Sequence, residues 1–180
     1  MSQPFASTKK ALRRFRRNRR GSAAVEFALV APVFFALLFA ILETGIIFFA
    51  GQVLETVTQD SARTIMTGQV QTAALTKTAF KTNVCARISV LFDCANGIYI
   101  DVQSYSAFSS VNITPPIDAS GNFMSTTMNY NPGASGDIVV VRVFYQWPLI
   151  VTGLGFSNVA NLTNNKRLLT ATAAFKNEPY

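Results

Sequence analysis

Apolar residues form a long run near the N-terminus, and this run dominates the pattern of the chain. Residues 27–42 contain no polar side chain; Glu43 and Thr44 then interrupt the run, which ends at Ala50. Twenty-four helical residues would span about 36 Å, enough to cross a hydrocarbon core of about 30 Å with some tilt. Because a cleavable secretory signal has a shorter apolar core, we expect a retained transmembrane span over residues 27–50.

The helical pattern continues beyond this span. Apolar residues recur every three to four positions from Val53 to Met66, and polar residues occupy the other side. Gly68 is a suitable C-terminal stop, so the pattern predicts one N-terminal helix over residues 22–68. Pro32 lies inside it and is expected to kink the helix or loosen its hydrogen bonding, which membrane helices tolerate.

A second amphipathic helix is predicted from Thr72 or Ala73 to about Leu91, with Thr72 as its N-cap. Its expected apolar face consists of Leu75, Ala79, Phe80, Val84, Ile88 and Leu91. This helix would carry Cys85 in its last turns and leave Cys94 just beyond its end.

Three later segments alternate between apolar and more polar residues, namely 98–103, 139–147 and 169–175. Too little helix lies between them for parallel crossovers, so they predict an antiparallel sheet whose middle strand ends at Pro148. With an amphipathic helix on one face, the expected fold class is α+β. A further edge strand is expected near residues 123–130, inside a long segment rich in Ser, Asn, Gly and Pro.

The net charge of +7 comes from one short arm. The first 21 residues contain no acid and eight basic side chains, Lys9, Lys10, Arg13, Arg14, Arg16, Arg17, Arg19 and Arg20. A basic arm can bind nucleic acid, but basic residues beside an apolar span keep that end in the cytoplasm. We therefore expect a basic cytoplasmic leader over residues 1–21, a periplasmic α+β domain over residues 69–180, and no nucleic-acid partner.

The two cysteines, Cys85 and Cys94, both follow the span. With the arm in the cytoplasm they lie in an oxidising compartment, where a disulfide between them can persist; two buried thiols are the alternative. The chain has no histidine, and two cysteines are too few for a structural zinc site. We find no catalytic constellation either, so we expect no metal, no cofactor and no enzymatic activity.

The most informative stretch is the junction between the arm and the apolar run. Gly21 ends the arm, Ser22 and three small or apolar residues follow, and Glu26 stands directly before Phe27. An acid at the start of a membrane span usually marks function or a paired partner. The alternative is that Glu26 lies at the membrane interface near the arginines, where its charge costs little.

With these residues the sequence resembles type IV prepilin-like proteins, and more closely the TadE-like minor pilin (pseudopilin) family of tight-adherence pilus systems. In that class a membrane peptidase cuts after the glycine of a basic leader, and a glutamate then lies fifth in the mature chain, before an aromatic residue. The resemblance implies cleavage between Gly21 and Ser22. It also implies that Glu26 and Phe27 act in subunit pairing and assembly. Segments at 41–45, 85–94, 145–148 and 175–178 look like the family as well.

The resemblance implies a pilin-like fold and a structural role in assembling a bacterial tight-adherence (Flp-type) pilus. The expected partners are a prepilin peptidase, other pilins and minor pilins, the inner-membrane assembly platform and the lipid bilayer. The protein would be a single-pass inner-membrane protein that could enter a surface pilus. The alternative is an uncleaved anchor that presents a periplasmic scaffold or binding domain to a secretion machine.

Two further features have alternative interpretations. Glu43, the second acid in the apolar run, is either protonated or paired with a polar group of another subunit, or else lies near the outer interface. Apolar residues between Trp147 and Phe156 either pack in the core, which we favour, or contact the membrane or a partner.

Overall fold

The computed structural model describes residues 21–150 and 159–180. The basic side chains before Gly21 and the apolar residues 151–156 lie outside the described residues. The chain divides into two compact units, Met1–Ile41 and Leu42–Tyr180. The elements in chain order are the helices α2 (Ser22–Met66), α3 (Gln69–Thr72) and α4 (Lys77–Cys85), the strand β1 (Ile98–Tyr105), the short 3-10 helices η2 (Phe108–Ser110) and η3 (Ser125–Thr127), and the strands β2 (Ile138–Pro148) and β3 (Lys166–Lys176).

The described part of the first unit consists of Gly21 and the N-terminal part of α2, which continues through Pro32 without ending. Its large apolar side chains are exposed all around the helix; Phe27 and Leu29, for example, are 68% and 72% exposed. Among the described residues, α2 is the helix long and apolar enough to cross a membrane. A helix that is apolar on every side needs an apolar environment, either lipid or other protein.

In the second unit α2 becomes amphipathic. One stripe of side chains, which recurs with each turn of the helix, is buried: Ile47, Ala50, Leu54, Val57, Thr58, Ser61, Ala62 and Ile65. The predicted change from an all-apolar to an amphipathic helix is therefore confirmed. The helix ends at Met66, and Gly68 follows with a φ of +74°. A Cβ at Gly68 would also lie 2.3 Å from the ring of Tyr180, so glycine is needed here for two reasons.

The predicted second helix is shorter than expected at both ends. Residues 69–72 form α3 as a separate turn, and Ala74 has a φ of +46°, which breaks the helix before α4. The N-cap is Thr76, whose hydroxyl accepts a hydrogen bond from the Ala79 N–H at 3.2 Å. Thr72 was therefore the wrong N-cap, because the apolar period runs through tight turns as well as through helix. After Cys85 the chain continues in such turns, which still bury Ile88.

The three predicted strands form one antiparallel sheet in the order β1-β2-β3, as the alternation indicated. β2 lies in the centre, where Val143 pairs with Ile100 of β1 and with Ala171 of β3. Its eleven residues end at Pro148, as predicted, because proline cannot donate a ladder hydrogen bond. The fold of the chain is thus α+β, with a long apolar helix, a short second helix and an antiparallel sheet.

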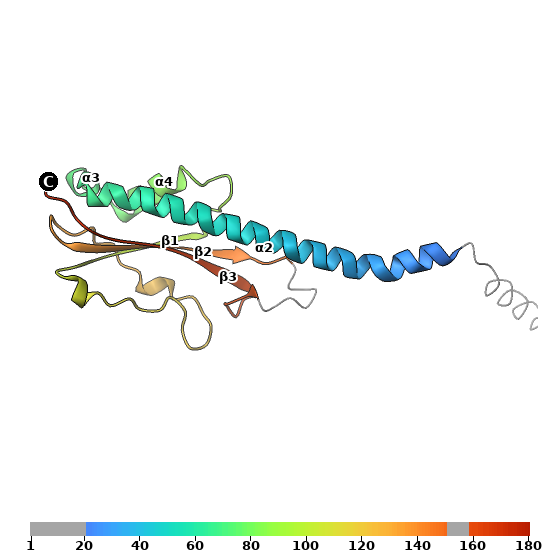
Figure 1. The fold of residues 1–180 in the computed structure, drawn as a ribbon. Coiled ribbons are helices and arrows are strands. Elements are labelled where there is room, and N and C mark those ends of the chain that lie inside the picture. The colour runs from blue at the N-terminus through green and yellow to red at the C-terminus, as the bar shows by residue number, and fades with distance from the viewer. Residues whose placement is uncertain (1–20, 151–158) are drawn as a thin grey trace, which may run out of the picture. The chain divides into compact units, whose positions relative to one another are not determined.

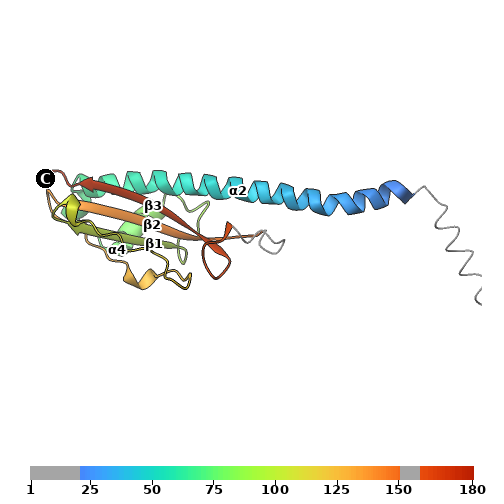
Figure 2. The ribbon, with the colours of Figure 1, turned by 60° about the horizontal axis from the view of Figure 1, so that its bottom comes forward.

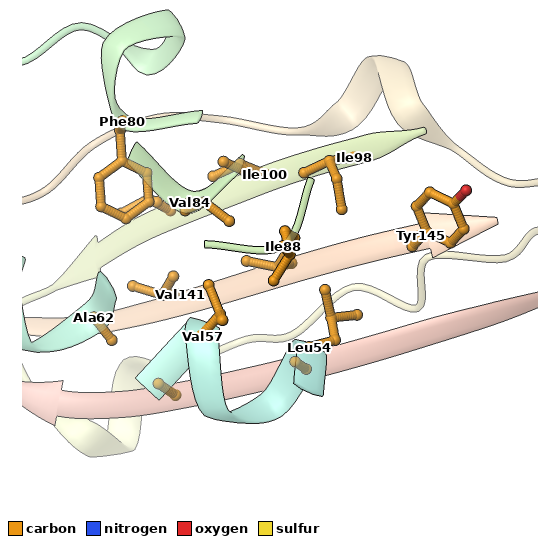
Figure 3. Close-up of a cluster of buried hydrophobic side chains, with 14 of the residues drawn as sticks. Leu54, Val57, Ala62, Phe80, Val84, Ile88, Ile98, Ile100, Val141 and Tyr145 are labelled. Atoms are coloured by element: carbon orange, nitrogen blue, oxygen red, sulfur yellow. The ribbon is translucent and has the colours of Figure 1, made fainter. Parts of the chain in front are cut away.

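The core lies between the helices and one face of this sheet. Figures 1 and 2 show the C-terminal part of α2 and helix α4 along the same face. Figure 3 shows the contact at side-chain level, where residues of α2 and α4 meet alternate residues of the strands: Leu54, Val57, Ala62, Phe80, Val84, Ile98, Ile100, Val141 and Tyr145. Each large apolar side chain buried in this way contributes about 1.5–3 kcal/mol.

The segment between β1 and β2 lies over the opposite face of the sheet. Phe144 is fully buried there, with Leu162 and Leu168, and the rings of Tyr99 and Phe123 pack beside it. The strand expected near residues 123–130 is not formed. Instead residues 125–127 form η3, and Tyr130 makes a single parallel bridge to Val102. A longer ladder is prevented because the Asn129 N–H donates to the Asp101 carboxylate at 2.8 Å.

A disulfide joins Cys85, the last residue of α4, to Cys94, with their Cα atoms 5.7 Å apart. It ties the end of α4 to the turn that leads into β1. The alternative interpretation, two buried free thiols, is therefore wrong.

We predict that neither cysteine of the membrane-extracted protein reacts with a thiol reagent until it is reduced. Closing a loop of this size stabilises a fold by roughly 2–3 kcal/mol in the chain-entropy model. The double variant Cys85→Ser/Cys94→Ser should therefore lower the free energy of unfolding by about this amount, measured by urea titration in detergent. Labelling of either wild-type cysteine without reductant would contradict the bridge.

Candidate functional site

The junction lies at the start of α2. Gly21 is the first described residue, and a Cβ added to it would meet nothing within 4 Å. Ser22 begins the helix and its hydroxyl donates to the Glu26 carboxylate at 2.9 Å, one turn further on. Phe27 is exposed. The junction therefore places an open Gly21–Ser22 peptide bond beside an acid at the positive end of the helix dipole.

Glu43 lies in the second unit, where its carboxylate is half-buried. It accepts a hydrogen bond from the backbone N–H of Ile150, which follows the end of β2. Sequence reasoning considered a partner in another subunit, but the structure provides one in the same chain. Of the residues singled out in the sequence, the structure thus brings together Ser22 with Glu26 and Cys85 with Cys94, and it adds Ile150 beside Glu43.

Sequence reasoning missed a buried ion pair on the loop-covered face of the sheet. The guanidinium of Arg142 on β2 donates to the Asp101 carboxylate on β1 at 2.7 and 3.0 Å. Both side chains are buried, at 8% and 1% exposure. The two residues are direct cross-strand partners. In the sequence each one stands as a charged residue within an alternating strand pattern, but only the strand register shows that they face each other.

This ion pair holds the long connection against the sheet. Arg142 also donates to the Thr114 carbonyl at 2.8 Å, and Asp101 accepts from the Asn129 N–H. Nearby, the Lys77 ammonium donates to the Met128 carbonyl at 3.0 Å. Burial lowers the pKa of Lys77, and the negative charge of Asp101 opposes part of that shift. These bonds tie the loop backbone at Thr114, Met128 and Asn129 to the sheet and to α4.

Among residues 21–150 and 159–180, no group of three His, Cys, Asp or Glu side chains could hold a metal ion. The cavities described around this part of the chain are open and of modest size. One of about 450 Å³ lies beside Thr64, Phe80 and Arg87, and one of about 400 Å³ lies between Phe48 and Arg167. Neither brings together an acid, a base and a nucleophile.

A known protein family matches the segment that contains the junction. A family model described as TadE-like protein matches residues 21–63. This N-terminal segment is similar to the TadE-like family. The matched range begins at Gly21, contains Glu26, Phe27 and Glu43, and ends within the packed part of α2. The resemblance to the TadE-like family is thereby confirmed.

No curated protein and no solved structure matches the chain. The TadE-like match stops before the disulfide and the sheet. The family resemblance of the later segments, including Tyr145 to Pro148 and Phe175 to Glu178, therefore stays a prediction. TadE-like, pilin-like proteins are structural and non-catalytic, and the family suggests a role in Tad pilus assembly.

The buried ion pair provides a test of what holds the loop. Replacing Asp101 with Asn leaves Arg142 charged and buried, which should lower the free energy of unfolding by about 3–5 kcal/mol. The matched control is Asp60→Asn, which removes an exposed pair to Arg87 at 3.0 Å and should cost about 0–1 kcal/mol. Urea unfolding of both variants in detergent measures the difference. Equal effects would show that the buried pair is not what stabilises this face.

Proposed function

We propose that this chain is a minor pilin or pseudopilin that acts structurally in assembling a bacterial tight-adherence pilus. The observation that carries the proposal is the TadE-like match beginning at Gly21, at the start of a helix with an acid in its second turn. A prepilin peptidase would remove the basic leader by cutting between Gly21 and Ser22. The exported domain would then lie in the periplasm, anchored by α2 in the inner membrane.

The exposed apolar part of α2 supports this role. Lipid can cover it while the subunit is in the membrane, and the apolar helices of other pilins can cover it in a filament. Aromatic pairs such as Phe34 with Phe35 and Phe35 with Phe39 already pack along its surface, at centroid distances of 5.5 and 6.3 Å. Large exposed aromatic groups of this kind mark an interaction surface.

Glu26 supplies the polar part of the same interaction. Cleavage would convert the amide nitrogen of Ser22 into an ammonium group. An isolated charge is costly in a dry filament core, so that ammonium requires a carboxylate partner. Glu26 of a neighbouring subunit can provide it, which fixes the axial position of one helix against the next. The partners would be other pilins and minor pilins, together with the inner-membrane assembly platform.

We expect the functional pool of the protein to begin at Ser22. Mass spectrometry of the intact, membrane-extracted chain measures this directly, and deletion of the peptidase provides the control in which the leader stays attached. If the functional pool retains residues 1–21, the chain is an uncleaved membrane anchor with a periplasmic scaffold domain, and the pilin proposal fails.

Glu26→Gln separates a pairing residue from a tolerated interfacial acid. Breaking a dry ion pair costs about 3–5 kcal/mol, so pilus formation should be lost, while processing and membrane level stay normal. Glu55→Gln is the matched control, because it removes the same charge from a half-buried position of α2, outside the apolar run, where the carboxylate accepts from Gln59. Normal piliation in Glu26→Gln would reject the pairing role, since an exposed acid contributes only about 0–1 kcal/mol.

A further inference from the structure

The chain that follows β2 meets α2 at the end of the apolar run. The Ile150 N–H donates to the carboxylate of Glu43, which is the first residue after the uninterrupted run at 27–42. A hydrogen bond requires direct contact, so Ile150 lies at the level of Glu43 along the helix. This contact belongs entirely to the second unit.

The contact limits where the hydrocarbon core can end. If the core reached Ala50, the irregular backbone around Ile150 would lie in the hydrocarbon region, where lipid-exposed irregular backbone does not occur. The core must therefore end near Leu42. Twenty helical residues, about 30 Å, extend back from there to Ala23, which matches the thickness of the hydrocarbon core. The structure thus favours a span of about 23–42 over the range 27–50 that hydropathy alone suggested.

The residues just beyond this boundary have the composition of a membrane–water interface. Ile150 is 86% exposed although its backbone is held by Glu43. Phe48 and Phe49 are 71% and 61% exposed and lie five and six residues past Glu43, about 8–9 Å along the helix. That distance falls within the headgroup layer, where interfacial helices bury Phe side chains at the boundary with the acyl chains.

Two cations lie at the same end of the sheet. Lys166 pairs with Pro148 in the strand register, and Arg167 pairs with Trp147. Arg167 is half-buried; it donates to the Val159 carbonyl at 2.9 Å and lines the cavity of about 400 Å³ beside Phe48. Lysine and arginine next to a membrane are attracted to anionic headgroups, and this attraction acts within a Debye length of about 8–10 Å.

We propose that Ile150, Lys166 and Arg167 form a membrane-proximal edge that rests in the headgroup layer of the bilayer crossed by α2. Trp147 lies beside this edge and packs against Phe92 and Tyr145 in the core. Ile150 enters the apolar side of the interface, and the two cations bind lipid phosphates. This inference rests on the proposed membrane anchorage of the chain. It gives the exported domain a second attachment to the bilayer, which has to be released when a subunit leaves the membrane.

The full-length protein in phosphatidylethanolamine–phosphatidylglycerol vesicles tests the position of this edge. Both native cysteines are in the disulfide, so Ile150→Cys introduces a single thiol that can carry a nitroxide label. Collisions with oxygen, which concentrates in lipid, should exceed collisions with a water-soluble nickel chelate at this position. The matched control is Phe108→Cys, an exposed apolar position beyond the far end of β1, where the chelate should dominate.

The two cations can be tested through Trp147, the single tryptophan of the chain. Lipids brominated near the headgroup end of their chains should quench its fluorescence. In Lys166→Gln this quenching should fall about twofold at low salt, because one headgroup contact is lost. Lys176→Gln removes the same charge from the other end of β3 and should leave quenching unchanged.

The label at position 150 could prove as accessible to the chelate as the label at position 108, in protein that stays with the vesicles after carbonate washing. That result would overturn the membrane-proximal edge alone. Equal quenching in Lys166→Gln and wild type would overturn the headgroup contact of Lys166. Loss of the protein from washed vesicles would instead overturn the membrane anchorage itself, and the edge with it.

Discussion

The burial of one stripe of α2 against the sheet is the contact on which the rest of the second unit depends. Leu54 and Ile65 are 1% and 0% exposed, and they belong to the same core cluster as Phe80 and Val84 of α4. The sheet has only three strands, which is marginal unless one face is covered by a helix. Without this stripe, β2 would expose a continuous row of valines.

This contact also determines the two roles of α2. A helix that packs one stripe against its own sheet has a defined orientation there. In contrast, the described N-terminal residues of α2 leave large apolar side chains exposed on every side of the helix. Under the proposed function, the same helix anchors the chain in lipid and, with Glu26 at its start, packs against the helices of other subunits. The basic side chains before Gly21 favour the cytoplasmic side for its N-terminus.

The opposite face of the sheet is organised by charge as well as by apolar contact. The Asp101–Arg142 pair and the Phe144 cluster together hold a long connection that has little regular structure of its own. Loops of that length are uncommon in compact domains unless something fixes them. Here the fixing groups are peptide N–H and C=O groups paired with buried side chains, so the loop can be irregular without leaving them unsatisfied.

Local periodicity was enough to predict the N-terminal helix, its change of character and the three strands. Each of these features depends on residues close in sequence, because a period of 3.6 or 2 repeats over a few turns or a few residues. The junction at Gly21, Ser22 and Glu26 is local for the same reason, and the TadE-like match begins there.

Features that depend on residues far apart were decided only by the tertiary structure. The strand register aligned Asp101 with Arg142, and the Asn129 N–H then bonded to Asp101, which prevented the expected strand at 123–130. The break at Ala74 replaced one predicted helix by α3 and α4. Likewise, hydropathy determined that the chain has an apolar span, but the contact of Ile150 with Glu43 was needed to infer where that span leaves the membrane. Periodicity carries no information about which distant groups meet, because that is set by how the packed elements align.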